Sequence, residues 1–173
     1  MLRLILGGAR SGKSRLAEQI AKDTGLAVTY IATAQAYDAE MQERIQHHQR
    51  ERPASWRLIE EPLNLAETLV KIDQAEHVIL VDCLTLWVSN LLMNDNPNLQ
   101  ADEFEKFINI LGQLKSHVIL VSNETGLGVV PMGQLSRKFV DESGRLHQRL
   151  GQIADSVVFC VAGFPMILKG EKV

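Results

Sequence analysis

The 173 residues carry a formal net charge of −3 at pH 7, with 46% apolar and 23% charged residues. This length and composition fit one globular domain, to which we assign residues 1–173. The acidic balance argues against a dedicated nucleic-acid binder, and the longest apolar run, Val78–Val88, is interrupted by Asp82 and too short to span a membrane. No targeting signal is visible, and Cys83 and Cys160 lie in apolar surroundings. We therefore expect reduced, buried thiols in a cytoplasmic protein.

The chain opens on a short apolar run, Leu2–Leu6, which leads directly into the octet Gly7–Ser14. The octet fits G-x-x-x-x-G-K-[ST], the pattern of a phosphate-binding loop between a strand and a helix. Its glycines let the backbone wrap around a phosphate, and its N–H groups point inward at the start of the helix. We expect Lys13 to reach the outer phosphates and the Ser14 hydroxyl to bind Mg²⁺. A chance glycine-rich turn is the alternative, which the flanking strand, the helix and a later acidic residue disfavour.

Strands and helices alternate along the rest of the chain. The run Val78–Val81 is apolar throughout, as in parallel strands that are covered on both faces. The alternation predicts an α/β fold with a mostly parallel sheet, flanked by helices and joined by right-handed crossovers. Hydrophobic periodicity and turn signals predict strands over residues 2–6, 26–32, 56–59, 78–81, 117–121 and 156–162. They predict helices over residues 13–22, 38–50, 64–72, 84–93, 102–114 and 135–153.

Polar residues follow several predicted strands, at the edge of the sheet where α/β proteins bind ligands. Asp82 ends the apolar strand 78–81 and is placed to hold a Mg²⁺-bound water; the alternative is a cap of the next helix, and both roles can coexist. Thr33 and Gln35 follow the second strand, although the same residues are common in an ordinary turn. Glu60 follows the third strand and can accept a hydrogen bond from a ribose or base, or simply face solvent.

A histidine and arginine cluster lies on the predicted helix 38–50 and just beyond it. Neighbouring residues on a helix are about 100° apart, so His47 and His48 cannot both face one site. His48 shares a face with Arg44, and an imidazole beside a nucleotide can act as a general base or as a nucleophile. Arg50 and Arg52 can hold phosphate oxygens. On spacing alone, a solvated helix end is the favoured alternative.

The segment Asn123–Pro131 follows the strand 117–121 and is rich in glycine. An Asn-Glu pair and several glycines at the carboxyl end of a strand favour a mobile substrate loop, and a long irregular connection is the alternative. The residues Ser143-Gly144-Arg145 either line the same cleft or interrupt the last helix.

Four motifs occur in order between residue 2 and about residue 168: Gly7–Ser14, Tyr30–Gln35, Arg44-Ile45-x-x-His48-x-x-x-Arg52-Pro53-x-x-Trp56, and Asn123-Glu124-Thr125-Gly126-x-Gly128-x-Val130-Pro131. With these motifs the chain resembles the bifunctional adenosylcobinamide kinase / adenosylcobinamide-phosphate guanylyltransferase family of cobalamin biosynthesis. The resemblance implies a RecA-like P-loop fold, and it implies a homotrimer. It also implies that ATP or GTP phosphorylates adenosylcobinamide, and that GMP then passes from GTP to that phosphate to give adenosylcobinamide-GDP.

The resemblance also implies roles for individual residues. His48 would carry GMP as a guanylyl-histidine, and Lys13 would act with it in catalysis. The resemblance therefore favours a functional His48 over the solvated helix end that spacing alone favours. Ser14 and Asp82 would hold Mg²⁺. The implied nucleotide contacts with GTP or ATP are Gly7, Gly8, Ala9, Arg10, Ser11, Gly12, Lys13, Ser14, Thr33, Ala34, Gln35, Gln49, Arg50, Glu51, Arg52, Glu60 and Asp82. The chain departs from the family pattern at Val140 and His147, where Arg and Asn are expected; both positions lie in the last predicted helix and concern substrate contacts.

Two other functions compete with this interpretation. A monofunctional P-loop kinase for a small molecule would share the phosphate loop but form no covalent intermediate. A RecA-like ATPase module acting on nucleic acid is disfavoured by the acidic balance and by the lack of an aromatic and basic stripe.

Overall fold

The computed structural model describes residues 1–35 and 53–170. In these residues the core of the fold is a 7-stranded sheet in the order β3-β2-β4-β5-β1-β6-β7, and all neighbouring strands are parallel except β6 and β7. The strands are β1 (Leu2–Gly7), β2 (Ala27–Ala32), β3 (Arg57–Glu60), β4 (His77–Asp82), β5 (His117–Asn123), β6 (Ser156–Val161) and β7 (Phe164–Lys169). The helices are α1 (Lys13–Asp23), α3 (Leu65–Ile72), α4 (Leu84–Leu92), α5 (Leu99–Leu111) and α6 (Gln134–Ile153). The predicted α/β fold with a mostly parallel sheet is confirmed.

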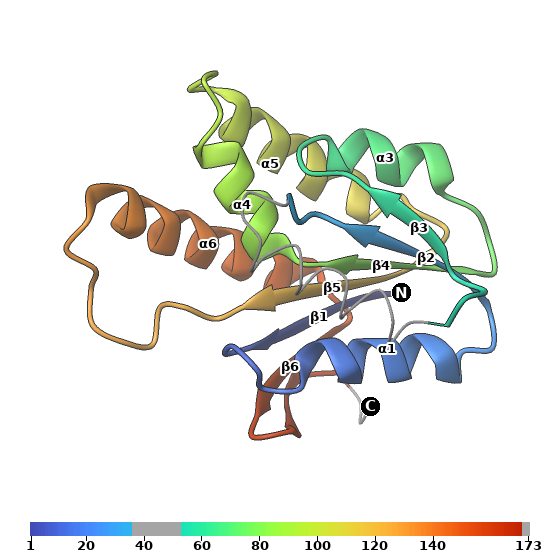
Figure 1. Ribbon diagram of the computed structural model, residues 1–173. Helices are drawn as coiled ribbons and strands as arrows, with labels where there is room; N and C mark the ends of the chain where they lie inside the picture. Colours follow the sequence, from blue (N-terminus) through green and yellow to red (C-terminus); the bar gives the residue numbers. More distant parts are fainter. Residues whose placement is uncertain (36–52, 171–173) are drawn as a thin grey trace.

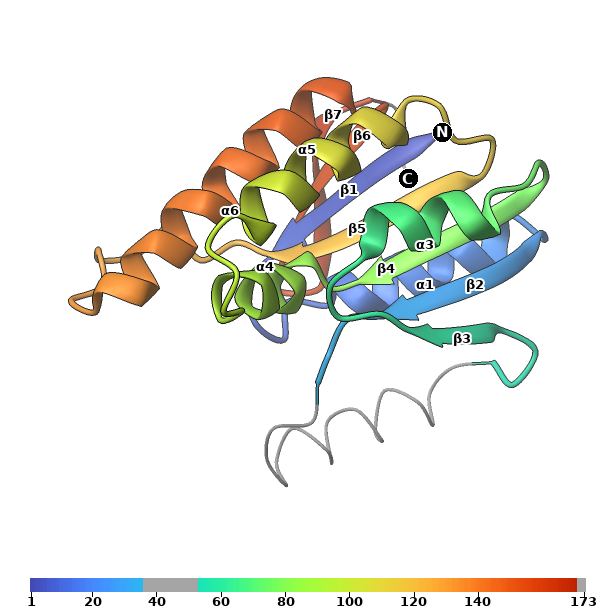
Figure 2. The same cartoon turned by 90° about the horizontal axis from the view of Figure 1, so that it is seen from above.

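Helices cover the sheet unequally. Helix α1 packs on one face, whereas α3, α4, α5 and α6 lie on the other (Figures 1 and 2). Side chains of successive strand residues point to opposite faces, so Leu4 of β1 joins the core under the four helices and Ile5 joins the core under α1. The strand residues Val78–Val81 are fully buried because both faces are covered, as their unbroken apolar run predicts.

The strand register brings the carboxyl ends of the parallel strands to one edge. Gly7 at the end of β1 pairs with Asn123 of β5 and with Cys160 of β6. Ala32 at the end of β2 pairs with Asp82 of β4 and with Glu60 of β3. The phosphate loop and the polar residues that follow the strands therefore leave the sheet at the same edge, where ligands bind in open α/β sheets.

The bounds of α5 and the additional strand β7 depart from the predictions, and α6 decides an alternative that the sequence left open. Helix α5 begins at Leu99 rather than at residue 102, directly after the loop that holds Pro97. Helix α6 runs without a break through Gly144 and Gly151, so Ser143-Gly144-Arg145 is no interruption. Strand β7 was not predicted. It pairs with β6 through the turn at Ala162 and Gly163, both with positive φ, a backbone conformation typical of two-residue hairpins.

Two expectations concern the chain outside this sheet. The helix predicted over residues 38–50 lies outside the described residues. Within the described parts of the chain, no helix combines the length and the apolar character needed to cross a membrane.

Candidate nucleotide site

The loop after β1 is shaped by its glycines. Gly12 has φ +92°, which L side chains rarely adopt, and a Cβ there would lie 3.2 Å from the Cα of Gly163. A Cβ on Gly7 would lie 2.4 Å from Ser11 Oγ and 2.8 Å from the carbonyl oxygen of Cys160. The β6–β7 turn supports the loop from this side, because the N–H of Gly163 donates to the carbonyl oxygen of Ser11 at 2.9 Å. The loop is thus closely packed against the sheet on its inner side.

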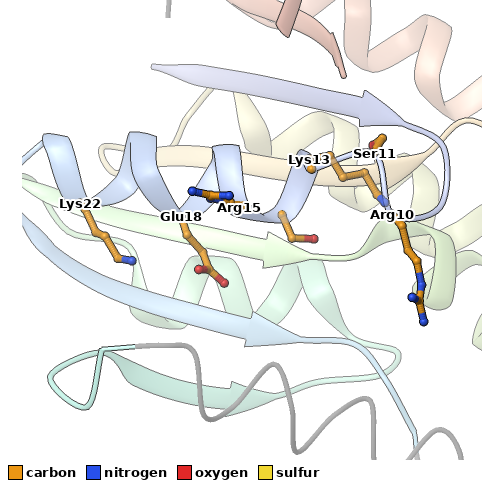
Figure 3. A pocket seen from close by; sticks show the side chains of 8 residues that line it. Arg10, Ser11, Lys13, Arg15, Glu18 and Lys22 are labelled. Atoms are coloured by element: carbon orange, nitrogen blue, oxygen red, sulfur yellow. The ribbon is translucent and has the colours of Figure 1, made fainter. Parts of the chain in front are cut away.

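A cavity of about 640 Å³ opens on the loop and along α1 (Figure 3). Its lining combines loop residues with charged residues of α1: Arg10, Ser11, Gly12, Lys13, Ser14, Arg15, Glu18 and Lys22. Lys13 is buried and its Nζ donates to the carbonyl oxygen of Gly8 at 3.1 Å, so the ammonium is folded over the loop. The Ser11 Oγ is buried and has no hydrogen-bond partner within the described residues. A cationic loop at a helix start that leaves a polar atom unsatisfied suits the oxygens of a phosphate.

The ends of β2 and β4 are joined by a side chain. Thr33 is fully buried; its hydroxyl donates to the carbonyl oxygen of Cys83 at 2.6 Å and accepts from the N–H of Cys83 at 3.0 Å. The expected position of Thr33 at the strand-end edge is correct, but its hydroxyl holds the neighbouring strand. Asn90 on α4 adds to this join, since its Nδ2 donates to the carbonyl oxygens of Thr33 and Pro62 at 2.9 and 3.1 Å.

Asp82 is the last residue of β4, directly before this join. The residue at the N-cap of α4 is Cys83, with no side-chain capping bond, so the alternative role of Asp82 as the helix cap is wrong. The Cys83 thiol is buried, and burial together with the charge of Asp82 raises its pKa to about 11. Both cysteines are free and buried, as predicted, and Cys83 is a neutral thiol at pH 7.

A second polar cluster lies where β5 ends, beside the loop. His147 of α6 is buried, with its Nε2 2.8 Å from Ser122 Oγ and its Nδ1 3.7 Å from Glu124 Oε2. Burial lowers the pKa of His147, and the nearby Glu124 carboxylate only partly offsets this. The Thr85 hydroxyl of α4 accepts from the N–H of Asn123 at 2.7 Å. The sequence singled out the Asn123–Pro131 segment, but it gave no signal that Thr85 and His147 contact this strand end.

The remaining expected residues fall into two groups. Glu60 is exposed at the end of β3, and Ala34 and Gln35 follow β2 at the same edge of the sheet. The others lie outside the described residues: His47, His48, Gln49, Arg50, Glu51 and Arg52.

Among the residues that are described, no three His, Cys, Asp or Glu side chains gather as a metal site. The Ser14 hydroxyl and the Asp82 carboxylate are hard oxygen donors of the kind that Mg²⁺ takes together with water and substrate phosphates.

A phosphate loop at the end of a central parallel strand, with an acidic residue ending β4, defines a P-loop nucleotide-binding protein with an α/β fold. Residues 3–168 match the family described as cobinamide kinase / cobinamide phosphate guanyltransferase. The chain belongs to this family, as its motifs predict.

Two relatives align with nearly the whole chain. It is 59% identical over 171 residues to the bifunctional adenosylcobalamin biosynthesis protein CobP of Pseudomonas aeruginosa, with 99% of each chain covered. It is 42% identical over 183 residues to the bifunctional adenosylcobalamin biosynthesis protein CobU of Salmonella typhimurium, covering 98% of this chain and 100% of the relative.

Solved structures share the fold at low sequence identity. A protein from Pyrococcus horikoshii aligns with a TM-score of 0.58 at 11% identity, covering 99% of this chain and 87% of the other. The P4 protein of bacteriophage φ6, solved in complex with ADP, aligns with a TM-score of 0.50 at 11% identity, covering 95% of this chain and 53% of the other. At these identities the likeness concerns the fold alone.

Proposed function

We propose that the chain performs its two family reactions in succession at one nucleotide site. It first phosphorylates the aminopropanol hydroxyl of adenosylcobinamide with ATP or GTP, and it then transfers GMP from GTP to the new phosphate, giving adenosylcobinamide-GDP and pyrophosphate. One observation carries this proposal: the phosphate loop follows β1, Asp82 ends β4 and Glu124 follows β5, and these three adjacent strands end at one edge of the sheet. Membership of a bifunctional family disfavours the monofunctional kinase and the ATPase module.

The described residues take distinct roles in this scheme. The loop Gly7–Ser14 binds the phosphates through its backbone N–H groups, and Lys13 stabilises charge on the leaving phosphates. Ser14 and Asp82 would hold Mg²⁺, which when bound neutralises the phosphates. Thr33 fixes the backbone at Asp82 through its hydrogen bonds to the next residue, Cys83. The nucleoside would contact residues along the same edge of the sheet, namely Ala34, Gln35 and Glu60.

The second reaction proceeds through His48 in this proposal. A neutral imidazole nitrogen of His48 bonds to the α-phosphorus of GTP, while the bond from that phosphorus to the pyrophosphate oxygen breaks. The phosphate of the phosphorylated cobinamide then displaces His48 and takes the guanylyl group. Histidine suits this step because its ordinary pKa near 6.5 leaves a free lone pair at neutral pH. Gln49–Arg52 would contact the same nucleotide.

We further propose one domain over residues 1–173, a cytoplasmic location and assembly into a homotrimer. Exposed apolar side chains support the assembly: Leu127, Val129 and Met132, in the segment before α6, are 80%, 96% and 95% exposed. Light scattering of the purified protein at several concentrations measures the subunit number directly. A monomer at all of them would contradict the trimer.

Product analysis tests the two reactions. With adenosylcobinamide, ATP and Mg²⁺, mass spectrometry should detect the phosphorylated cobinamide, and GTP should convert it into adenosylcobinamide-GDP. Formation of the first product without the second would support the monofunctional kinase. Hydrolysis of ATP that needs nucleic acid and no cobinamide would support the ATPase module.

A further inference from the structure

The three nucleophiles of the proposed reactions differ in one respect. The imidazole and the phosphate each attack with a lone pair that is free at neutral pH, whereas the hydroxyl of adenosylcobinamide carries a proton that must leave as its oxygen bonds to phosphorus. General-base catalysis therefore benefits the kinase step alone. The residue that takes this proton has to lie beside the phosphate loop and to be unused by the metal.

Glu124 has the required position. Its backbone N–H donates to the carbonyl oxygen of Gly7 at 3.1 Å, and this hydrogen bond holds the backbone of Glu124 beside the first glycine of the phosphate loop. Its strand β5 lies directly beside β1, whereas Glu60 ends β3, which β2, β4 and β5 separate from β1. Asp82 is assigned to the metal. The Glu124 side chain is 22% exposed, so solvent and substrate can reach it.

The surroundings of Glu124 hold its carboxylate in place. Its Oε1 accepts from the N–H of Gly126 at 2.6 Å, and its Oε2 lies 3.7 Å from His147 Nδ1. That nitrogen is buried and has no hydrogen-bond partner in the described part of the chain, so a small shift of the Glu124 carboxylate toward it would satisfy it. The carboxylate favours the tautomer with the proton on Nδ1, in which Nε2 accepts from the Ser122 hydroxyl at 2.8 Å. His147 thus joins α6 to the end of β5.

We propose that Glu124 is the general base of the kinase step and that His147 is the positioning residue that orients its carboxylate. This inference rests on the proposed function. The hydroxyl oxygen of the substrate bonds to the γ-phosphorus, and the bond from that phosphorus to the bridging oxygen breaks. The electron pair of that bond leaves with the nucleoside diphosphate. The proton of the hydroxyl moves to a Glu124 carboxylate oxygen and passes from there to solvent.

The assignment predicts that the two activities separate in Glu124→Gln. We expect kcat for phosphorylation of adenosylcobinamide to fall about 100-fold or more, with KM for ATP changed less than about 3-fold. Labelling of the protein by α-phosphate-labelled GTP, and GMP transfer to phosphorylated cobinamide supplied ready-made, should stay within about 2-fold of wild type. Asp141→Asn is the matched control, because it removes an exposed carboxylate of α6 and should leave both activities unchanged.

Two variants of His147 test the positioning role while the carboxylate is kept. His147→Leu removes the donor, and kcat of the kinase step should fall about 10-fold, with GTP labelling retained. His147→Asn places an amide N–H near the position of Nδ1 and should restore the rate to within about 3-fold of wild type.

Each outcome bears on the proposal. Unchanged kinase activity in Glu124→Gln, or equal loss of both activities in folded protein, would overturn the role of Glu124. If Glu124→Gln does not fold, the two His147 variants test the proposal instead. Equal kinase rates in His147→Leu and His147→Asn would overturn it. A wild-type protein that never phosphorylates adenosylcobinamide would instead contradict the proposed function itself.

Discussion

The hydroxyl of Thr33 bridges two strand ends by bonding twice to the backbone of Cys83, donating to its carbonyl oxygen at 2.6 Å and accepting from its N–H at 3.0 Å. Both groups are buried, so no water can replace these bonds. Because Cys83 follows Asp82 directly, the bridge also fixes the backbone that carries this carboxylate. A residue that the motif assigns to the nucleotide therefore stabilises the edge of the sheet.

The substitution Thr33→Val should reveal this role. It keeps the shape of the side chain but leaves the N–H of Cys83 without its partner, while the carbonyl of Cys83 still accepts from the N–H of Trp87 at 3.3 Å. We therefore expect a loss of about 1 to 3 kcal/mol in the free energy of unfolding. Thr33→Ser keeps the hydroxyl and should lose less than about 1 kcal/mol. Urea denaturation of the three proteins measures the difference, and equal stabilities of the two variants would contradict the role of the bridge.

The position of Lys13 predicts which nucleotides depend on it. Lys13→Ala should weaken GTP binding about 10- to 100-fold, because charge-assisted bonds to the outer phosphates are lost, while GMP binding should change less than about 3-fold. Calorimetric titration with both nucleotides in the presence of Mg²⁺ provides the comparison. Lys71→Ala, which removes an exposed lysine paired with Glu67, is the charge-matched control. A similar loss for GTP and GMP would place the ammonium elsewhere.

The core under the four helices centres on Trp87. Its side chain is fully buried, and its Nε1 donates to the carbonyl oxygen of Leu63 at 2.8 Å. The centroid of its ring lies 5.4 Å from that of Phe104 and 4.8 Å from that of Phe107. Trp87→Ala should cost about 3 to 5 kcal/mol of unfolding free energy. Trp87→Phe keeps the ring contacts but loses the hydrogen bond, and should cost roughly 1 to 3 kcal/mol. A cost below about 1 kcal/mol for the alanine variant would argue against this packing.

Acid should destabilise the protein partly through His77. Burial lowers the pKa of this imidazole, whose Nε2 lies 3.0 Å from Thr29 Oγ1. In the unfolded chain the histidine has its ordinary pKa near 6.5, so on acidification the unfolded state takes up the proton first. The free energy of unfolding should therefore fall as the pH drops below about 6.5, and it should stop falling through this group below the pKa of the folded state.

The variant His77→Gln isolates that contribution. Glutamine can still bond to the Thr29 hydroxyl but does not titrate, so the variant should lose less stability than wild type between pH 7.5 and pH 5.5. Buried His147 has a lowered pKa too, but it is present in both proteins and cancels in the difference. Equal losses in denaturation experiments at the two pH values would contradict the prediction.

The sequence predicts the sheet well where local patterns decide the structure. The apolar run of β4, the phosphate-loop pattern and the β-branched run of β5 each mark a buried parallel strand, and Asp82 falls at the end of β4 as expected. Strand β7 escapes prediction although Phe164–Leu168 is apolar, because Pro165 lacks a backbone N–H and argues against a strand there.

The parts of the site that the sequence does not predict depend on contacts between distant residues. Nothing local to His147 indicates that it meets Ser122, 25 residues earlier, because helical periodicity only places it on the buried side of α6. Likewise, Thr33 reads as a strand-end residue open to ligand, and only its pairing with Cys83, 50 residues later, accounts for its burial. Such contacts follow from the strand order, which periodicity does not encode.

Labelling the protein with GTP that carries a radioactive α-phosphate tests whether His48 becomes covalently bonded to GMP. With Mg²⁺, wild-type protein and His47→Ala should both acquire label that is lost in acid and stable in base, as a phosphoramidate is, and His48→Ala should acquire none. Label that persists in His48→Ala, or wild-type protein that remains unlabelled, would show that His48 does not carry GMP.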